Sequence, residues 1–280
     1  MGCEILVAGS ALIGLPAGSC INFVSRHLCR SQTQTTGSSC PACGDAGRVW
    51  LAILPFKWRS PCPACDSAPS WRRPAIEVVT ALVFAAIAAR HGAQLMVPLW
   101  CAFAALLIAC AATDLEHGIV PDELSLGGLG VALPLVPACV SLGGGSFSGT
   151  FASALVGALL GGGSLWLLGF VHARASVAFG RHFEHWPGPG EVLPSPSSVD
   201  YWTWFPGIGF GDVKLMALVG ATLGPLGVLD TIAAATVIGL AQGLVAALGS
   251  RRWSAPFRFA PAIAVGALTV VLVPGNLLRP

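Results

Sequence analysis

The stretch LMVPLWCAFAALLIACAA, residues 95–112, contains eighteen consecutive residues without a charged side chain. A helix needs about 20 mostly apolar residues to cross the hydrocarbon core of a bilayer. The polar sequence TDLEHGIVPD follows it directly, at residues 113–122. The stretch therefore predicts a membrane-spanning helix that ends beside a polar segment carrying Asp114.

The composition of the whole chain agrees with this prediction. Hydrophobic residues make up 54% of its 280 residues and charged residues only 10%, whereas roughly 25% of the residues of a soluble domain are charged. Such a chain cannot cover a soluble core with a solvated surface, which excludes an ordinary soluble enzyme and a disordered protein. The net charge of +2 provides no basic surface for nucleic acid.

Apolar runs of similar length recur along the chain and predict an all-α integral membrane protein with about eight transmembrane helices. The number falls to seven if the two runs on either side of Gly227 form one kinked helix. The predicted spans are Ile5–Val24, Pro74–Ala89, Leu95–Ala112, Leu124–Leu142, Phe151–Val171, Leu215–Leu229, Ile232–Leu248 and Phe259–Val273.

Lys and Arg residues are distributed unevenly between the predicted loops. With eight spans and the N-terminus outside, the loops 25–73, 113–123, 172–214 and 249–258 hold 13 of the 15 Lys and Arg residues. Positively charged residues collect in cytoplasmic loops, so these four loops are predicted to be cytoplasmic. Residues 1–24 are predicted to be a retained first helix, because no basic residue precedes the apolar run.

Two polar stretches divide the predicted helices. Residues 25–73 form a predicted cytoplasmic domain, and residues 74–280 form a membrane core that carries a cytoplasmic insertion at residues 173–205. The insertion is rich in Pro, Ser and His, which disfavours regular structure. Two interpretations of it stay open, a disordered loop and a contact with a substrate or partner.

Four of the ten cysteines form two Cys-Pro-Ala-Cys pairs, Cys40 with Cys43 and Cys62 with Cys65, with 18 residues between the pairs. Two CxxC pairs at this separation are typical of a tetrahedral zinc site with four thiolate ligands. Two disulfides or a redox motif are the alternatives, and a reducing cytoplasm argues against stable disulfides. We therefore predict a small zinc-binding loop domain between the first two helices.

Asp114 and Asp212 are both predicted to lie at the cytoplasmic edge of the bilayer. Two carboxylates at one depth could form an aspartic dyad, in which one activates a water molecule and the other protonates the scissile carbonyl. Gly209 and Gly211 would then let a substrate backbone approach closely. Spacing alone favours the simpler interpretation that each Asp caps a helix or anchors an interface.

Several segments, in this order, resemble the type IV prepilin peptidase family of GxGD-type membrane aspartic proteases. The matching segments are GLPAGSCIN at 14–22, the two CxxC pairs, RPAIE at 73–77, ATDLEHGIVPD at 112–122, GFGDVKL at 209–215 and PFRFAP at 256–261. The resemblance implies an enzyme that cuts the basic leader from type IV prepilins or type II secretion pseudopilins. It also implies a location in the bacterial inner membrane, with the active site on the cytoplasmic side.

The resemblance further implies roles for individual residues. Asp114 and Asp212 would be the catalytic dyad, supported by Gly209, Gly211 and Lys214 of the second motif. The residues implied to bind zinc are Cys40, Cys43, Cys62 and Cys65.

Many members of the family also N-methylate the new N-terminus with S-adenosylmethionine. Here Ser60 and Pro61 precede Cys62, where the family usually has Gly followed by Arg or Lys, an element associated with methyl transfer. S-adenosylmethionine is therefore a cofactor only if this chain keeps the second activity.

Two further alternatives are left open. Glu77 follows Arg72 and Arg73 closely, so it either forms a surface ion pair with them or has a functional role in methyl transfer. The competing function for the whole chain is a non-enzymatic, zinc-bearing membrane scaffold for pilus or secretion assembly. The expected partners are a prepilin or pseudopilin and membrane lipid.

Overall fold

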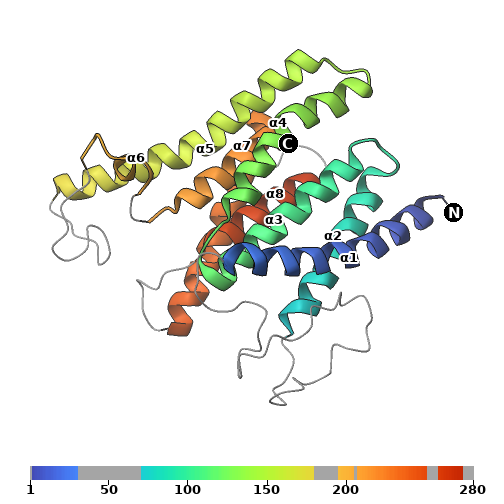
Figure 1. Ribbon diagram of the computed structural model, residues 1–280, viewed down its shortest axis with the longest axis horizontal. Helices are drawn as coiled ribbons and strands as arrows, with labels where there is room; N and C mark the ends of the chain where they lie inside the picture. Colours follow the sequence, from blue (N-terminus) through green and yellow to red (C-terminus); the bar gives the residue numbers. More distant parts are fainter. Residues whose placement is uncertain (1, 31–70, 180–194, 205–206, 251–257, 274–280) are drawn as a thin grey trace.

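The computed structural model describes residues 2–30, 71–179, 195–204, 207–250 and 258–273, and the regular structure in these ranges is helical (Figure 1). The helices are α1 (Gly2–Arg30), α2 (Arg72–His91), α3 (Val97–His117), α4 (Asp122–Leu142), α5 (Phe147–Ala178), α6 (Val199–Thr203), α7 (Phe210–Ser250) and α8 (Ala260–Leu272).

Six of these helices, α1 to α5 and α7, are long and apolar enough to cross a membrane. This confirms the prediction of an all-α, multi-pass membrane protein. The predicted number of eight spans is not confirmed. The runs 215–229 and 232–248 both lie in α7, and the run 259–273 forms α8, a helix of only 13 residues.

Helix α7 folds back on itself at Gly224, which has the non-helical angles φ 72° and ψ −179° and is followed by Pro225. A side chain at Gly161 of α5 would lie 2.3 Å from the carbonyl oxygen of Met216 and 3.4 Å from Cγ2 of Val228. In a straight helix these two α7 residues would be roughly 18 Å apart. The two arms of α7 therefore run in opposite directions, and the break lies at Gly224 rather than near Gly227.

Small residues allow the most extensive helix contacts, which join α5 to α7 and α1 to α2. A Cβ atom at Gly157 of α5 would lie 2.1 Å from the carbonyl oxygen of Gly220 in α7. At Gly18 of α1 it would lie 2.5 Å from the Cα atom of Glu77 in α2. Helices in lipid associate through such close packing, so these glycines set the positions of α1 and α7.

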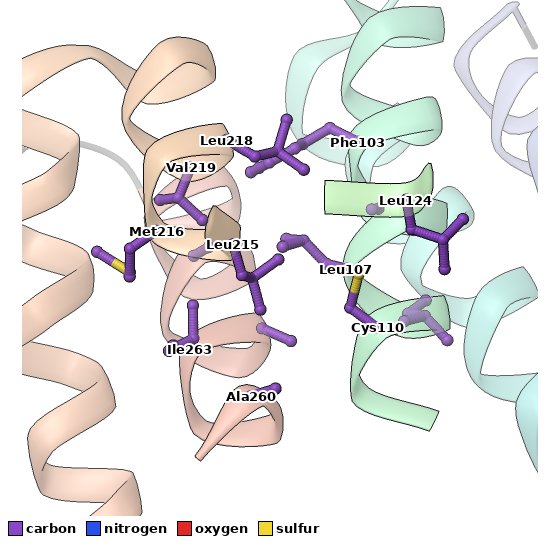
Figure 2. Packing of buried hydrophobic residues seen from close by; sticks show 14 of the residues in the cluster. Phe103, Leu107, Cys110, Leu124, Leu215, Met216, Leu218, Val219, Ala260 and Ile263 are labelled. Atoms are coloured by element: carbon purple, nitrogen blue, oxygen red, sulfur yellow. The ribbon is translucent and has the colours of Figure 1, made fainter. Parts of the chain in front are cut away.

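The main apolar core lies where α3 and α4 meet α7 and α8 (Figure 2). Figure 2 shows Leu107 and Cys110 of α3 on one side of this core and Leu215 of α7 on the other, and all three are fully buried. Since α3 ends and α7 begins next to this core, their packing positions both acidic motifs.

The predicted insertion at residues 173–205 is helical at its start and near its end. Helix α5 continues to Ala178, beyond the predicted end of its span at Val171. The short helix α6 is capped by the hydroxyl of Ser198, which accepts a hydrogen bond from the N–H of Tyr201. The described parts of the stretch are therefore ordered elements of the fold.

Candidate active site

Charged side chains gather at the end of the bundle where α3 finishes. Arg72, at the start of α2, forms an ion pair with Glu116 of α3 at 3.4 Å. Lys214 of α7 forms an ion pair with Asp122, the first residue of α4. One pair joins α2 to α3 and the other joins α7 to α4, at the end that also carries Asp114 and Asp212.

Asp114 lies in the last turn of α3 and is only 7% exposed. Its carboxylate accepts a hydrogen bond from the backbone N–H of Ala260, the first residue of α8, and is attracted by the charge of Arg258. The N-terminus of a helix stabilises negative charge, so the start of α8 supports this carboxylate. Its Oδ2 atom is buried and has no hydrogen-bond partner among the described residues, which leaves it available to a water molecule or substrate.

Arg258 also acts on the backbone that carries Asp114. Its guanidinium donates a hydrogen bond to the carbonyl oxygen of Leu115. That oxygen belongs to the last turn of α3, where carbonyl groups have no partner within the helix. Arg258 therefore fixes the end of α3 and places a positive charge beside the carboxylate.

Asp212 lies in the first turn of α7 and is half-buried. Its backbone N–H donates a hydrogen bond to the carbonyl oxygen of Gly209 at 3.0 Å, and its carboxylate accepts one from the N–H of Gly209. This pattern resembles the reciprocal bonds that cap a helix N-terminus. Gly209 is exposed, so the capped turn borders solvent.

The two acidic motifs touch each other directly. A Cβ atom at Gly211 would lie 2.9 Å from the Cβ atom of Val120, in the loop after α3. The negative charge of Asp114 acts on the carboxylate of Asp212 through space. The structure thus brings the predicted site residues of both motifs to one place.

Lys214 is one of these predicted residues, and its side chain contacts two other parts of the site. Besides its ion pair with Asp122, its ammonium group lies 5.0 Å from the centroid of the Phe210 ring. Phe210 stands between the two glycines of the second motif. Lys214 therefore connects the loop before Asp212 to the start of α4.

Two acidic side chains in this arrangement suit general acid–base chemistry. An ionised carboxylate can take a proton from water, and a protonated one can donate to a developing oxyanion or amine. Because the charge of Asp114 acts on Asp212, the two groups oppose each other's ionisation, and a proton on one of them relieves this repulsion. The site lies at one end of an apolar bundle, within reach of water.

Two residues of the site were not singled out by sequence reasoning. Arg258 and Asp122 both lie inside segments that carried the family resemblance, PFRFAP and ATDLEHGIVPD. Their charge alone gives no signal, because their partners Leu115 and Lys214 are distant in the sequence.

Glu77 does not form the predicted surface ion pair. It is 2% exposed and accepts a hydrogen bond of 2.8 Å from the hydroxyl of Ser19 in α1. Arg72 instead pairs with Glu116, while Arg73 attracts the charge of Glu77. The surface interpretation fails because α1 covers this face of α2, and the functional role of Glu77 stays a prediction.

The four predicted zinc ligands, Cys40, Cys43, Cys62 and Cys65, lie outside the described residues. Within the described ranges, no group of three or more His, Cys, Asp or Glu side chains could hold a metal ion. The zinc site therefore stays a prediction.

Comparison with known proteins places the chain in a family. The model of the type IV leader peptidase family matches residues 101–244, which include Asp114, Asp212 and both motifs. This chain belongs to the type IV leader peptidase family. The bacterial peptidase A24 N-terminal domain matches residues 12–91, which include the two CxxC pairs.

Three curated relatives are named prepilin leader peptidase/N-methyltransferase. The one from Burkholderia pseudomallei is 31% identical over 82% of this chain and 64% of its own length. The relative from Pectobacterium carotovorum is 30% identical over 85% of this chain and 75% of its own length. The relative from Bacillus subtilis is 27% identical over 86% of this chain and 83% of its own length.

This chain thus spans about two thirds of the Burkholderia protein, 64% of its length. No solved structure matches the chain significantly.

Proposed function

We propose that this chain is a membrane aspartic endopeptidase that removes the basic leader of type IV prepilins or type II secretion pseudopilins. The observation that carries the proposal is that the two acidic motifs pack together at Gly211 and Val120, at the charged end of an apolar helix bundle, where the charge of Asp114 acts on Asp212. Membership of the type IV leader peptidase family supports it.

In the proposed reaction, one carboxylate takes a proton from a water molecule while the other, protonated, donates to the scissile carbonyl oxygen. Water adds to the carbonyl carbon, the C–N bond breaks, and a proton passes to the leaving amine. The unpaired Oδ2 atom of Asp114 is a suitable acceptor for the water. The exposed Gly209 leaves room for the substrate backbone beside Asp212.

The proposed cellular location is the bacterial inner membrane, with the site facing the cytoplasm. The concentration of Lys and Arg in four predicted loops supports this orientation. A prepilin presents its leader next to an apolar helix, so a site at the end of a membrane bundle suits that substrate.

We also propose that Cys40, Cys43, Cys62 and Cys65 hold one zinc ion. Four thiolates in two CxxC pairs fit a closed tetrahedral zinc site, which would stabilise the loop between α1 and α2. Metal analysis of the purified protein should give about one zinc per chain, and the Cys40→Ser/Cys43→Ser variant should lose it.

N-methylation of the cleaved pilin is a second proposed activity, and it is favoured by the names of the relatives. Purified protein incubated with cleaved pilin and labelled S-adenosylmethionine should transfer label to the pilin N-terminus. An unlabelled product would limit the function to cleavage.

The decisive experiment measures prepilin processing in membranes that contain the Asp114→Asn or Asp212→Asn variant. We expect each variant to accumulate normally but to leave the prepilin uncut, because amides cannot exchange the required protons. Glu123→Gln is the matched control, since that carboxylate lies one residue beyond the first motif, in the first turn of α4, and is exposed. Full processing by both variants would refute the proposal and favour the scaffold, which should fail only when the Cys pairs are lost.

A further inference from the structure

Four aromatic side chains join the short helix α6 to the C-terminal part of α5. We call Trp166, Phe170, Tyr201 and Trp202 the α6 cluster. The Trp202 ring stacks on Phe170 and on Trp166, with ring centroids 5.4 and 6.3 Å apart, and Tyr201 meets Phe170 edge-on at 5.7 Å. Offset and edge-on contacts of this kind are the favourable geometries for aromatic pairs.

Hydrogen bonds from α5 reinforce this contact. The Trp166 indole N–H donates to the carbonyl oxygen of Trp202 at 2.8 Å, and the Arg174 guanidinium donates to that of Tyr201 at 2.6 Å. The guanidinium carbon of Arg174 also lies 3.9 Å from the centroid of the Tyr201 ring. A helix of five residues has little stability of its own, so α6 depends on these contacts with α5.

The same part of α5 also holds the loop that precedes Asp212. Ala173 of α5 is fully buried, and Trp166, Phe170, Ile208 and Phe210 all pack against it. Ile208 and Phe210 are the direct neighbours of Gly209, whose N–H and carbonyl groups bond to Asp212. A displacement of the α6 cluster would therefore reach the Asp212 carboxylate through a short series of contacts.

We propose that the α6 cluster positions Asp212, with Trp202 as its principal positioning residue. Residues 199–203 of the insertion, for which sequence analysis left a disordered loop and a substrate or partner contact open, then contribute to the reaction by holding the second acidic motif. Figure 1 shows α6 lying beside the end of α5. The proposal rests on the proposed peptidase function for its effect on rate, but the positioning itself can be measured without activity.

The test compares the Trp202→Ala variant with the unmodified chain, both in detergent micelles. Two quantities are measured, the hydrogen–deuterium exchange of the backbone amides and the steady-state cleavage of a prepilin. We expect exchange in residues 207–214 to become at least about tenfold faster, while residues 97–114 stay unchanged. We expect kcat to fall by about 10- to 100-fold with little change in KM, because the acid is misplaced rather than the substrate released.

Two variants make the comparison specific. Trp202→Phe keeps a stacking ring and should restore most of kcat and of the protection from exchange. Trp204→Ala is the matched control, because Trp204 directly follows α6, is as exposed as Trp202 (48% and 45%) and is not part of the cluster. It should leave both measurements at the level of the unmodified chain.

Several results would overturn the proposal. The first is that hydrogen exchange in residues 207–214 of Trp202→Ala stays as slow as in the unmodified chain. The second is that Trp204→Ala changes exchange and kcat as much as Trp202→Ala does. The third is that exchange in Trp202→Ala becomes faster while kcat stays the same. If Trp202→Ala fails to fold, Trp202→Leu keeps an apolar side chain without the flat ring and should give intermediate effects on both measurements. An unmodified chain that cuts no prepilin would refute the peptidase function alone, since the exchange comparison still tests the positioning.

Discussion

Asp114 and Asp212 reach the same end of the bundle with different kinds of support. Asp114 is buried, and it is held by helix packing, by the first N–H of α8 and by the charge of Arg258. Asp212 is half-buried and follows a loop with two glycines, where it exchanges two hydrogen bonds with the backbone of Gly209. The difference teaches that one acid is fixed by the core, whereas the other depends on its loop and on what packs against that loop.

The largest effect should come from lengthening each acid by one methylene group. Asp114 is only 7% exposed, so the longer Asp114→Glu side chain would crowd its neighbours, and we expect complete loss of prepilin cleavage and reduced accumulation. Asp212 lies in a turn that borders solvent, so the Asp212→Glu variant should keep a measurable fraction of the activity. Cleavage rates and protein levels in membranes check this, and equal loss in both variants would contradict the proposed difference in rigidity.

A methyl group at Gly211 should separate the two motifs. Gly211→Ala would place its Cβ atom 2.9 Å from that of Val120, and overpacking of this kind costs about 1–3 kcal/mol. Cleavage should fall strongly, and Gly211→Ala/Val120→Gly should recover part of it because the opposing side chain is gone.

Gly127→Ala, in α4, is the control for that experiment, since its Cβ atom would have no neighbour within 4 Å among the described residues. A loss as large as that of Gly211→Ala would show that the contact with Val120 is not what makes Gly211 important.

Removing the charge beside Asp114 should have a moderate effect. Arg258→Gln loses the positive charge and weakens the bond to the carbonyl of Leu115. We expect kcat for prepilin cleavage to fall roughly three- to tenfold with KM unchanged. Arg90→Gln, which removes a charge from the last turn of α2, should leave the rate unchanged. The same fall in both variants would argue against a local role for Arg258.

The smallest effect should come from the ion pair between Lys214 and Asp122. The Asp122 side chain is 59% exposed, although that of Lys214 is only 16% exposed, and water around one partner limits such a pair to about 1 kcal/mol. Thermal unfolding and cleavage should therefore change little in Asp122→Ala, which leaves the contact of Lys214 with Phe210 in place. Complete inactivation of Asp122→Ala would show a larger role for the ion pair.

Parts of the fold could be predicted because bilayer thickness alone sets the length of an apolar run. The runs beginning at Leu95 and Leu124 became α3 and α4 nearly as expected. The bend of α7 could not be located, because Gly224 and Gly227 are both suitable residues for a break. Packing against Gly161 of α5 selects Gly224, and the local sequence does not contain that information.

In the candidate site, too, some residues could be predicted from the sequence and others could not. The carboxylates of Asp114 and Asp212 stood out because acids beside apolar runs need an explanation. Their partners Ala260 and Arg258 did not stand out, since a backbone N–H has no sequence signature and Arg258 lies far away in the chain. A surface ion pair was one of two interpretations of Glu77, because its neighbours in the sequence are arginines, while α1 covers it in the structure.

The sequence by itself determined the helical, membrane-embedded character of this protein and the identity of its two acidic motifs, because hydrophobic run length and residue type are local properties. Only the tertiary structure decided that α8 supports Asp114, that α7 turns back at Gly224, and that α5 packs against both α6 and the loop before Asp212. These are contacts between segments distant in the chain, and they form because close helix packing and hydrogen bonding in a dry interior favour one arrangement.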